Sequence, residues 1–382
     1  MSAAILLTGG NGFLGSYAID WLVKNTDRPV LALIRAKDAE AAVERLWDAL
    51  QFHLDEDGFR AALDRVIPVR GDLHAPGLGL SAPDRERVLS EADSVLHIAA
   101  SLNRKSDKAC FNTNLRGTLS IVKLAMEMEA RGTLVRFTDV STAAVAGKRQ
   151  GELVDEEHTV DWDRSDYDPY ARTKKFAEHL SHELLPREKV LVLRPTTVMG
   201  DSRHARSWQT DMVRAFVSLA DLPVVPVDPR SRIDIVPGDF VGTAIAELHT
   251  KPALRWSQYS LSAGTGSATG GSIAEAMRAA GHKVRFERRM ERPFEWAVRG
   301  MNRLPRGPAQ QLGAVMKVFW PYIVYDTVFD NTRVTTELGR GPARFESYCA
   351  GMYAYAKEVR FENPRRARSE GAVCRGDAES PS

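Results

Sequence analysis

The chain has 382 residues, of which 43% are hydrophobic and 27% charged, and its formal net charge is +2. Such a chain can build one large domain or a domain with a smaller lobe, and its near-neutral charge argues against a nucleic-acid partner. No apolar run is long enough to span a membrane, and no leader pattern precedes the first apolar segment. Cys110, Cys349 and Cys374 lack metal-ligand and disulfide spacing. We therefore expect a cytoplasmic protein without a metal site.

Strand-like and helix-like segments alternate along the chain, and this order predicts a parallel sheet covered on both faces. Short apolar runs predict six strands, which lie at residues 3–7, 30–34, 65–69, 94–98, 134–138 and 190–193. A strongly helical segment, 39–47, lies within an insertion, 36–64, between the second and third strands. Beyond Gly200 the pattern loosens, as expected of a substrate lobe. The composition of residues 364–382 predicts a disordered tail.

Glycines at positions 9, 12 and 15 lie at the turn between the first strand and a helical segment, 16–23. At such a turn the backbone can bend sharply and approach a pyrophosphate, which the helix N-terminus attracts. The spacing therefore predicts a dinucleotide site, and the alternative is a glycine-rich turn that binds no ligand.

The end of the second strand indicates which nicotinamide cofactor binds. Enzymes that use NAD usually place Asp or Glu there, to bind the ribose 2′-hydroxyl. Here the strand is followed by Arg35, Ala36 and Lys37. A guanidinium can bind a 2′-phosphate through two hydrogen bonds, so we predict NADPH (NADP) as the cofactor. The alternative is that Arg35 is an ordinary solvated charge.

Tyr170 and Lys174 are one helical turn apart, directly after a helix start at Asp168. A hydride that reaches a carbonyl carbon leaves a charged oxygen, which needs a proton donor, and the phenol of Tyr170 fits that role. Lys174 would favour the phenolate electrostatically and hold the nicotinamide ribose. A further hydroxyl should orient the carbonyl, and the residues after the fifth strand offer Ser141 and Thr142.

The chain resembles the extended short-chain dehydrogenase/reductases. The motifs that carry the resemblance lie at residues 8–15, 71–73, 97–100, 114–118, 140–147, 170–174 and 194–200. It implies an α/β fold with a Rossmann-type doubly wound parallel sheet and a smaller C-terminal substrate lobe. In this family the catalytic hydroxyl precedes the glycine of its loop motif by five residues, which favours Thr142 over Ser141.

The resemblance divides the chain into an NADP-binding Rossmann domain, 1–260, and a C-terminal substrate lobe, 261–363. Segments of the lobe are expected to be interleaved from about residue 200. The predicted catalytic residues are Thr142, Tyr170 and Lys174. The predicted cofactor-binding residues are Gly9, Asn11, Gly12, Phe13, Leu14, Gly15, Arg35, Asp72, Leu73, Ala99, Ala100, Tyr170, Lys174, Pro195 and Thr197.

Two subgroups of the family fit less well. Sugar-nucleotide dehydratases have an acidic pair after the catalytic Thr, where this chain has Ala143 and Ala144. Sugar epimerases usually have an acid after the second strand and a short connection to the third. Segments 65–73, 234–241 and 328–333 instead resemble the fatty acyl-CoA reductases and thioester reductases, the male-sterility-type NAD-binding subgroup, although Gly238 stands where Val is expected.

This resemblance implies that NADPH reduces an acyl thioester, linked to coenzyme A or to an acyl carrier protein, to an aldehyde and in a second step to an alcohol. It also allows a homodimer formed through helices beside 170–174. The alternatives are an NAD(P)-dependent carbonyl or hydroxysteroid-type dehydrogenase, a sugar-nucleotide epimerase, and a nucleotide sensor without catalysis.

Two segments of the lobe have a notable composition. Arginines alternate with apolar residues over 285–306 and could meet coenzyme A phosphates, an acidic carrier or a membrane surface. We favour an ordinary amphipathic helix there. Residues 319–325 are rich in aromatic side chains and are expected in the core or in the wall of a substrate tunnel.

Overall fold

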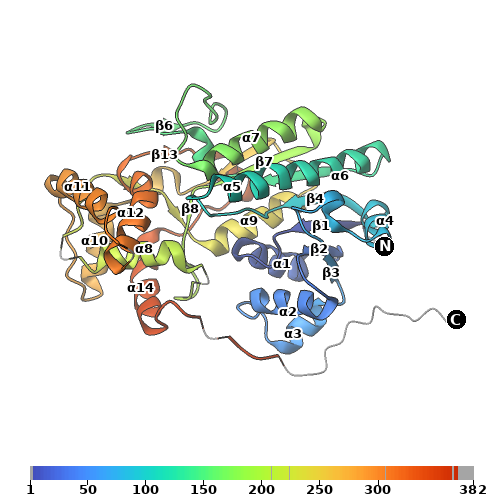
Figure 1. Cartoon of the computed structure of the whole chain (residues 1–382), viewed down its shortest axis with the longest axis horizontal. Helices are drawn as coiled ribbons and strands as arrows, with labels where there is room; N and C mark the ends of the chain where they lie inside the picture. The colour runs from blue at the N-terminus through green and yellow to red at the C-terminus, as the bar shows by residue number, and fades with distance from the viewer. Residues whose placement is uncertain (1–2, 208, 223, 306, 364, 369–382) are drawn as a thin grey trace.

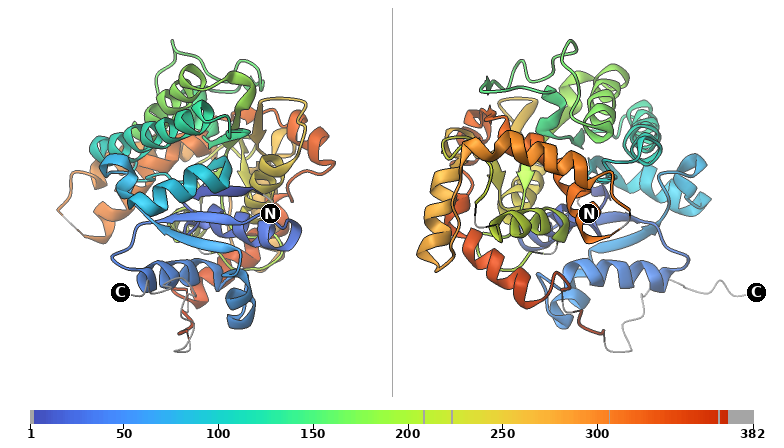
Figure 2. Two further views of the ribbon diagram at one scale, coloured as in Figure 1. Left: turned by 90° about the vertical axis from the view of Figure 1, so that its right-hand side faces the viewer. Right: turned by 60° about the vertical axis from the view of Figure 1, so that its left-hand side comes forward.

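The fold is built on one parallel sheet, shown in Figures 1 and 2 as a computed structural model. The structure describes residues 3–207, 209–222, 224–305, 307–363 and 365–368. The strands of the sheet are β1 Ala4–Thr8, β2 Val30–Ile34, β3 Val66–Arg70, β4 Ala92–His97, β5 Arg136–Val140, β7 Val190–Pro195 and β11 Gln258–Leu261. Their order is β11-β7-β5-β4-β1-β2-β3, and every pairing is parallel.

This topology confirms the predicted α/β class. Each apolar run that predicted a strand forms one, with ends that differ by at most two residues. Within the seven-stranded sheet, β11 is the strand that was not predicted, because Gln258 and Ser260 break its apolar run. The strand order reverses at β1, which has β2 on one side and β4 on the other. Ligands of doubly wound sheets bind at such a switch point, outside the carboxyl ends of the strands.

Helices cover both faces of the sheet because successive strand residues point to opposite sides. Ile5 and Leu7 belong to one buried cluster, and Leu6 belongs to another. The helices of the first face are α1 Phe13–Asn25, α2 Ala39–Leu50, α3 Glu56–Ala62 and α9 Gly238–Thr250. Those of the second face are α4 Ala82–Glu91, α6 Thr118–Ala130 and α7 Pro169–Leu184. Figure 1 shows α6 and α7 on the side opposite α1 and α2.

A helical lobe lies beside the sheet and has a hydrophobic cluster of its own. Its helices are α8 Thr210–Ala220, α10 Gly270–Ala279, α11 Glu291–Met301, α12 Pro308–Val324 and α14 Cys349–Glu358. Because α8 precedes β11 in the chain, the lobe takes segments from both sides of that strand. Within α11, Val298 is buried while Arg292 and Arg299 are exposed, as in an amphipathic helix. The division into domains at residue 260 stays a prediction.

Short elements complete the chain. The two-residue strands pair as β8 Thr197–Val198 with β10 Ile235–Val236, β9 Arg232–Ile233 with β12 Ala268–Thr269, and β6 Leu153–Val154 with β13 Val328–Phe329. The remaining helices are α5 Asp107–Cys110, the π-helix η2 Phe111–Gly117, α13 Thr332–Leu338, and the 3₁₀ turns η1 Pro76–Gly79, η3 Ala143–Ala146, η4 Arg187–Lys189, η5 Gly264–Gly266, η6 Arg288–Met290 and η7 Phe345–Ser347. No helix in the described ranges has the length and apolar character needed to cross a bilayer.

The predicted tail, 364–382, lies outside the described residues except for residues 365–368. This stretch runs along α2: the indole nitrogen of Trp47 donates to the carbonyl of Arg366 at 2.9 Å, and the amide of Arg366 donates to Gln51 Oε1 at 2.7 Å. Arg368 forms an ion pair with Glu44 at 3.0 Å. The chain therefore returns to the N-terminal insertion after it leaves the lobe.

Two glycines let α1 and α9 pack closely. A methyl group at Gly242 would lie 2.3 Å from Cβ of Tyr17, and one at Gly238 would lie 2.5 Å from Cζ of Phe13. Gly238, which stands where the resemblance leads us to expect Val, therefore leaves room for the Phe13 ring.

We expect Gly242→Ala to lower the free energy of unfolding by about 1–3 kcal/mol, because the added methyl group overpacks the interface between α1 and α9. Gly300→Ala, in helix α11, is the matched control, since a methyl group at this position would meet no atom of another element within 4 Å. Alanine has a greater helix propensity than glycine, so this variant should be slightly more stable than the wild type. Urea unfolding measures both variants, and equal stabilities would contradict this account of the packing.

Candidate active site

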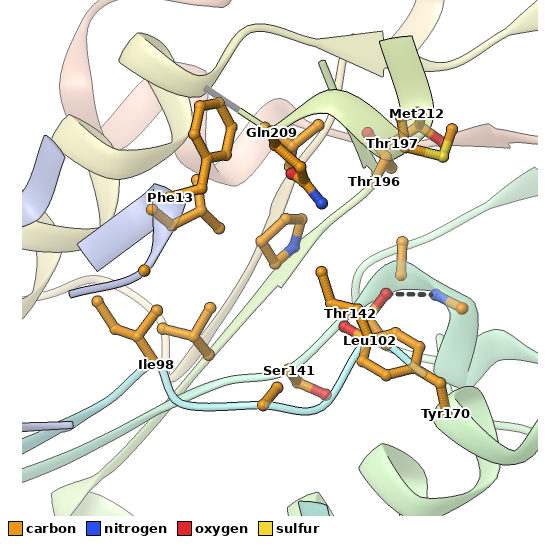
Figure 3. A pocket seen from close by; sticks show the side chains of 18 of the residues that line it. Phe13, Ile98, Leu102, Ser141, Thr142, Tyr170, Thr196, Thr197, Gln209 and Met212 are labelled. Carbon is orange, nitrogen blue, oxygen red and sulfur yellow. Dashed lines mark hydrogen bonds between the residues drawn. The ribbon is translucent and has the colours of Figure 1, made fainter. Parts of the chain in front are cut away.

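A cavity of about 670 Å³ opens at the carboxyl ends of the strands, between the sheet and the lobe. The glycine loop, the loops after β4, β5 and β7, and helices α7, α8 and α12 contribute to its wall. Most predicted site residues line it: Gly9, Asn11, Gly12, Phe13, Leu14, Gly15, Arg35, Ala99, Ala100, Thr142, Tyr170, Pro195 and Thr197. Asp72, Leu73 and Lys174 do not. Figure 3 shows part of this wall.

The glycine loop is tight enough to explain its glycines. Gly9 has a φ of 78°, and a methyl group there would lie 2.7 Å from the amide nitrogen of Ala99. A methyl group at Gly15 would lie 2.0 Å from the carbonyl oxygen of Gly9. The amide of Gly12 donates to that same carbonyl at 2.9 Å, and α1 begins at the next residue. The loop thus presents a helix N-terminus to the cavity, where an anion is stabilised.

Two arginines line the cavity beyond this loop. Arg35, at the end of β2, is exposed, and no carboxylate in the described part of the chain forms an ion pair with it. Arg45, on α2, was not predicted, and a test for basic residues on the helix after the second strand would have found it.

A neighbouring hollow is lined by Arg35, Arg70 and Asp72, so Asp72 lies beside the cavity rather than in it. Leu73 packs against the buried cluster on the α6 side of the sheet.

The hydroxyls of Thr142 and Tyr170 face the cavity side by side (Figure 3). Thr142 follows β5 and accepts a hydrogen bond from the amide of Ala144 at 3.3 Å, which begins the turn η3. Tyr170 lies in the first turn of α7, where Asp168 caps the helix by accepting from the amide of Ala171 at 2.9 Å. Helix capping and a strand end thereby fix the two side chains.

Ser141, the other hydroxyl considered, also touches the cavity but is bonded to α7. Its Oγ donates to Glu178 Oε2 at 2.8 Å, and both residues are buried. Glu178 in turn forms a buried ion pair with Arg194 of β7. This engagement favours Thr142 as the hydroxyl that meets a substrate.

Lys174 is buried behind Tyr170 and does not reach the cavity wall. Its Nζ lies 3.0 Å from Asp139 Oδ1, and these side chains are 1% and 0% exposed. His97, also fully buried, is hydrogen-bonded to Thr8. Burial, reinforced by the charge of Lys174, lowers the pKa of His97 to about 3, so its ring is neutral near pH 7. Because the ring of His97 is neutral, Lys174 and Asp139 form the ion pair of this buried region. The contact of Lys174 with a nicotinamide ribose stays a prediction.

Arg104 links the site to the lobe and was not predicted. Its guanidinium lies 4.4 Å from the ring centre of Tyr170, a cation–π distance. Its Nη1 donates to Asp168 Oδ2 at 3.0 Å and to the Tyr322 hydroxyl of α12 at 2.7 Å. The ring of Tyr322 stacks on Tyr167 with centres 4.6 Å apart. Segment 319–325 contributes Pro321, Tyr322 and Tyr325 to the cavity wall, and its place in a substrate tunnel stays a prediction.

Asn114 holds the loop after β4, which carries Ala99, Ala100 and Arg104. Its side chain accepts from the amide of Ser101 at 2.6 Å and donates to the carbonyl of Ser101 at 3.1 Å. It also donates to Thr173 of α7 at 3.3 Å. Asn114 lies in the π-helix η2, a kind of helix that is frequent at functional sites.

Asp234 is a buried acid in the cavity wall. Its Oδ1 accepts from Thr196 Oγ1 at 2.7 Å and from the amide of Ala263 at 2.9 Å. Burial outweighs these hydrogen bonds and raises the pKa of Asp234 to about 6. Within the described ranges, no group of three or more His, Cys, Asp or Glu side chains could hold a metal ion.

We expect Asp234→Asn to change how stability depends on pH. The wild-type native state retains a proton that the unfolded state loses as pH rises from about 4 to 6, so the wild type loses stability across that window. The free energy of unfolding of the variant, relative to wild type, should rise by up to about 3 kcal/mol between pH 4 and 7. Urea unfolding at several pH values measures this. Asp27→Asn, at a fully exposed side chain, is the control. A difference that stays constant with pH for Asp234→Asn would refute the shift.

Comparison with known proteins yields a family match and several relatives. Residues 7–245 match the model of the male sterility protein family. The chain is 31% identical over 260 residues to the nonribosomal peptide synthetase asaC of Aspergillus flavus, covering 65% of this chain and 25% of that protein. It is 28% identical over 280 residues to the fatty acyl-CoA reductase wat of Drosophila melanogaster, covering 63% and 53%. The chain thus spans a quarter and about half of these relatives.

A solved structure is similar over nearly the whole chain. The terminal R domain from the myxalamid PKS-NRPS biosynthetic pathway matches with a TM-score of 0.79 and 25% identity, over 96% of this chain and 93% of that one. The family match covers more than half of the residues and includes the glycine loop, Thr142 and Tyr170. The chain therefore belongs to the male sterility protein family and carries its nicotinamide-dinucleotide-binding domain.

Proposed function

We propose that this protein is an NADPH-dependent reductase that converts an acyl thioester into an aldehyde. The observation that carries the proposal is the arrangement of one cavity, in which the glycine loop lies at one end and the hydroxyls of Thr142 and Tyr170 lie together at the other. The relatives support the same chemistry, because one is a fatty acyl-CoA reductase and the similar solved structure is the terminal R domain of a biosynthetic pathway.

The reaction follows from these positions. NADPH, when bound, supplies a hydride to the carbonyl carbon. Thr142 and Tyr170 donate hydrogen bonds to the carbonyl oxygen as it gains negative charge, and Tyr170 transfers its proton to it. The resulting hemithioacetal collapses: its hydroxyl returns a proton to Tyr170 as the carbon–oxygen double bond forms, the carbon–sulfur bond breaks, and the thiolate takes a proton from solvent, so that an aldehyde and a free thiol leave. A second hydride transfer through the same residues would give an alcohol.

Two arginines support NADPH over NADH. Arg35 and Arg45 both line the cavity beyond the glycine loop, where an adenosine 2′-phosphate would lie. Helix α2 of the insertion carries Arg45 to that position. Two guanidinium groups suit a phosphate dianion, whereas a free ribose hydroxyl calls for an acid.

The acyl group would be joined to a carrier protein or to coenzyme A. The similarity to asaC, a peptide synthetase, and to an acyl-CoA reductase supports both kinds of thiol. A reductase of free aldehydes or ketones would use the same residues, so the assay must separate the two activities. Cytoplasmic location and a homodimer stay predictions.

We expect the protein to oxidise NADPH, followed at 340 nm, when it is given acyl-CoA thioesters, with one free thiol released per aldehyde formed. Tyr170→Phe should lower turnover at least ~100-fold, because the general acid is lost, while NADPH binding persists. Tyr353→Phe is the matched control, since this tyrosine of α14 lines no part of the cavity. If the protein reduced free aldehydes but turned over none of the thioesters, the proposal would be overturned.

We also expect Arg35→Ala to raise the Michaelis constant for NADPH about 10- to 100-fold, which is the usual contribution of a charge-assisted hydrogen bond. The constant for NADH should change much less, because NADH lacks the phosphate. Lys37→Ala is the control, since Lys37 is exposed and lines no cavity found in the described part of the chain. Steady-state kinetics with both cofactors decides, and equal effects on both would contradict the assignment.

A further inference from the structure

A second cavity lies inside the helical lobe, among α8, α10, α12 and the short strands β9 and β10. It is narrow, at about 60 Å³, and its lining is apolar apart from Thr197 and Tyr322. None of the lining residues is charged. Residues that give it this character are Met199, Ala215, Phe216, Ile233, Met277 and Phe286.

The second cavity adjoins the active-site cavity. Three residues, Thr197, Met212 and Tyr322, belong to the walls of both. Figure 3 shows Met212 and Thr197 close together, on the side of the active-site cavity that faces Thr142 and Tyr170. The hydroxyl of Tyr322 is hydrogen-bonded to Arg104 and Asp168, which fixes the position of this side chain in the shared wall.

Met212 is the adjustable part of this partition. Its side chain is half-buried, unbranched and flexible, so a rotamer change can open a passage between the two cavities at little cost. Met199 and Met277 add two further deformable side chains to the inner wall. A cavity with such a wall adapts to the shape of a flexible chain.

We propose that the second cavity binds the distal part of the acyl chain whose thioester carbonyl lies at Thr142 and Tyr170. This inference rests on the proposed function and names its substrate class, a linear aliphatic acyl group. A peptidyl group fits poorly, because its amides would be buried in the apolar lining without hydrogen-bond partners. The volume holds about four to six carbon-sized groups.

Chain length is the measurable consequence. Each methylene that enters an apolar cavity should tighten binding about fourfold. The gain should stop once the cavity is full. Polar or branched ends should not show the gain, since they cannot enter the cavity without losing hydration or displacing its wall.

The experiment measures dissociation constants of unreactive S-alkyl thioethers of pantetheine, from ethyl to dodecyl, by calorimetry, and in parallel the turnover of the matching thioesters. Ala215→Phe fills the cavity from α8, where Ala215 is buried and does not touch the active-site cavity. Ala356→Leu is the matched control, because Ala356 is a buried alanine of the same hydrophobic cluster that lines neither space. Met277→Ala enlarges the cavity and serves where the phenylalanine variant does not fold.

We expect wild-type affinity to rise about fourfold per methylene until a plateau. Ala215→Phe should weaken decyl binding at least tenfold with ethyl binding unchanged, and Met277→Ala should move the plateau to longer chains. Affinity that is independent of chain length, or variants that leave the series unchanged, would overturn the assignment of the cavity. Chain-length-dependent binding without turnover of any thioester would instead refute the proposed function and leave the cavity assignment standing.

Discussion

The site depends on two buried ion pairs that hold helix α7 against the sheet. Lys174 is paired with Asp139 of β5, and Glu178, one turn later, is paired with Arg194 of β7. Buried pairs add little net stability, because removing charges from water costs about as much as their attraction returns. Breaking one pair, however, leaves a buried charge without a partner, so sliding or rotation of α7 is strongly disfavoured. The position of Tyr170 in the first turn of this helix follows from that constraint.

The active-site cavity is a composite of the sheet and the lobe. Arg104, from the loop after β4, contacts Tyr170, the helix cap Asp168 and Tyr322 of the lobe helix α12. One guanidinium thus links Tyr170 to the wall that the cavity shares with the apolar space in the lobe. A shift of α12 would alter the environment of Tyr170 through Arg104 and Asp168, both of which contact Tyr322, without any movement of the sheet.

Local patterns in the sequence predicted the sheet and much of the cavity. Apolar runs marked the strands, and the glycine spacing, Thr142 and Tyr170 marked positions that line the cavity, since each depends on neighbours within a few residues. The rest arises between distant segments. Asp139 meets Lys174 across 35 positions and Arg104 meets Tyr322 across 218, and Arg45 reaches the cavity because the insertion folds back over it. The local spacing of residues does not predict contacts between distant segments. The burial of Lys174 was missed for the same reason, because it depends on the contact with Asp139.

The strap formed by residues 365–368 has a consequence for the nucleotide end of the cavity. The strap contacts Glu44, Trp47 and Gln51, in helix α2 and at its end. Arg45, which lines the cavity, directly follows Glu44 in this helix. A segment from the far end of the described chain thereby contacts the helix that brings Arg45 to the cavity. Cleavage or fusion just before this strap would therefore disturb the position of Arg45 at a distance, while Thr142 and Tyr170 kept their places.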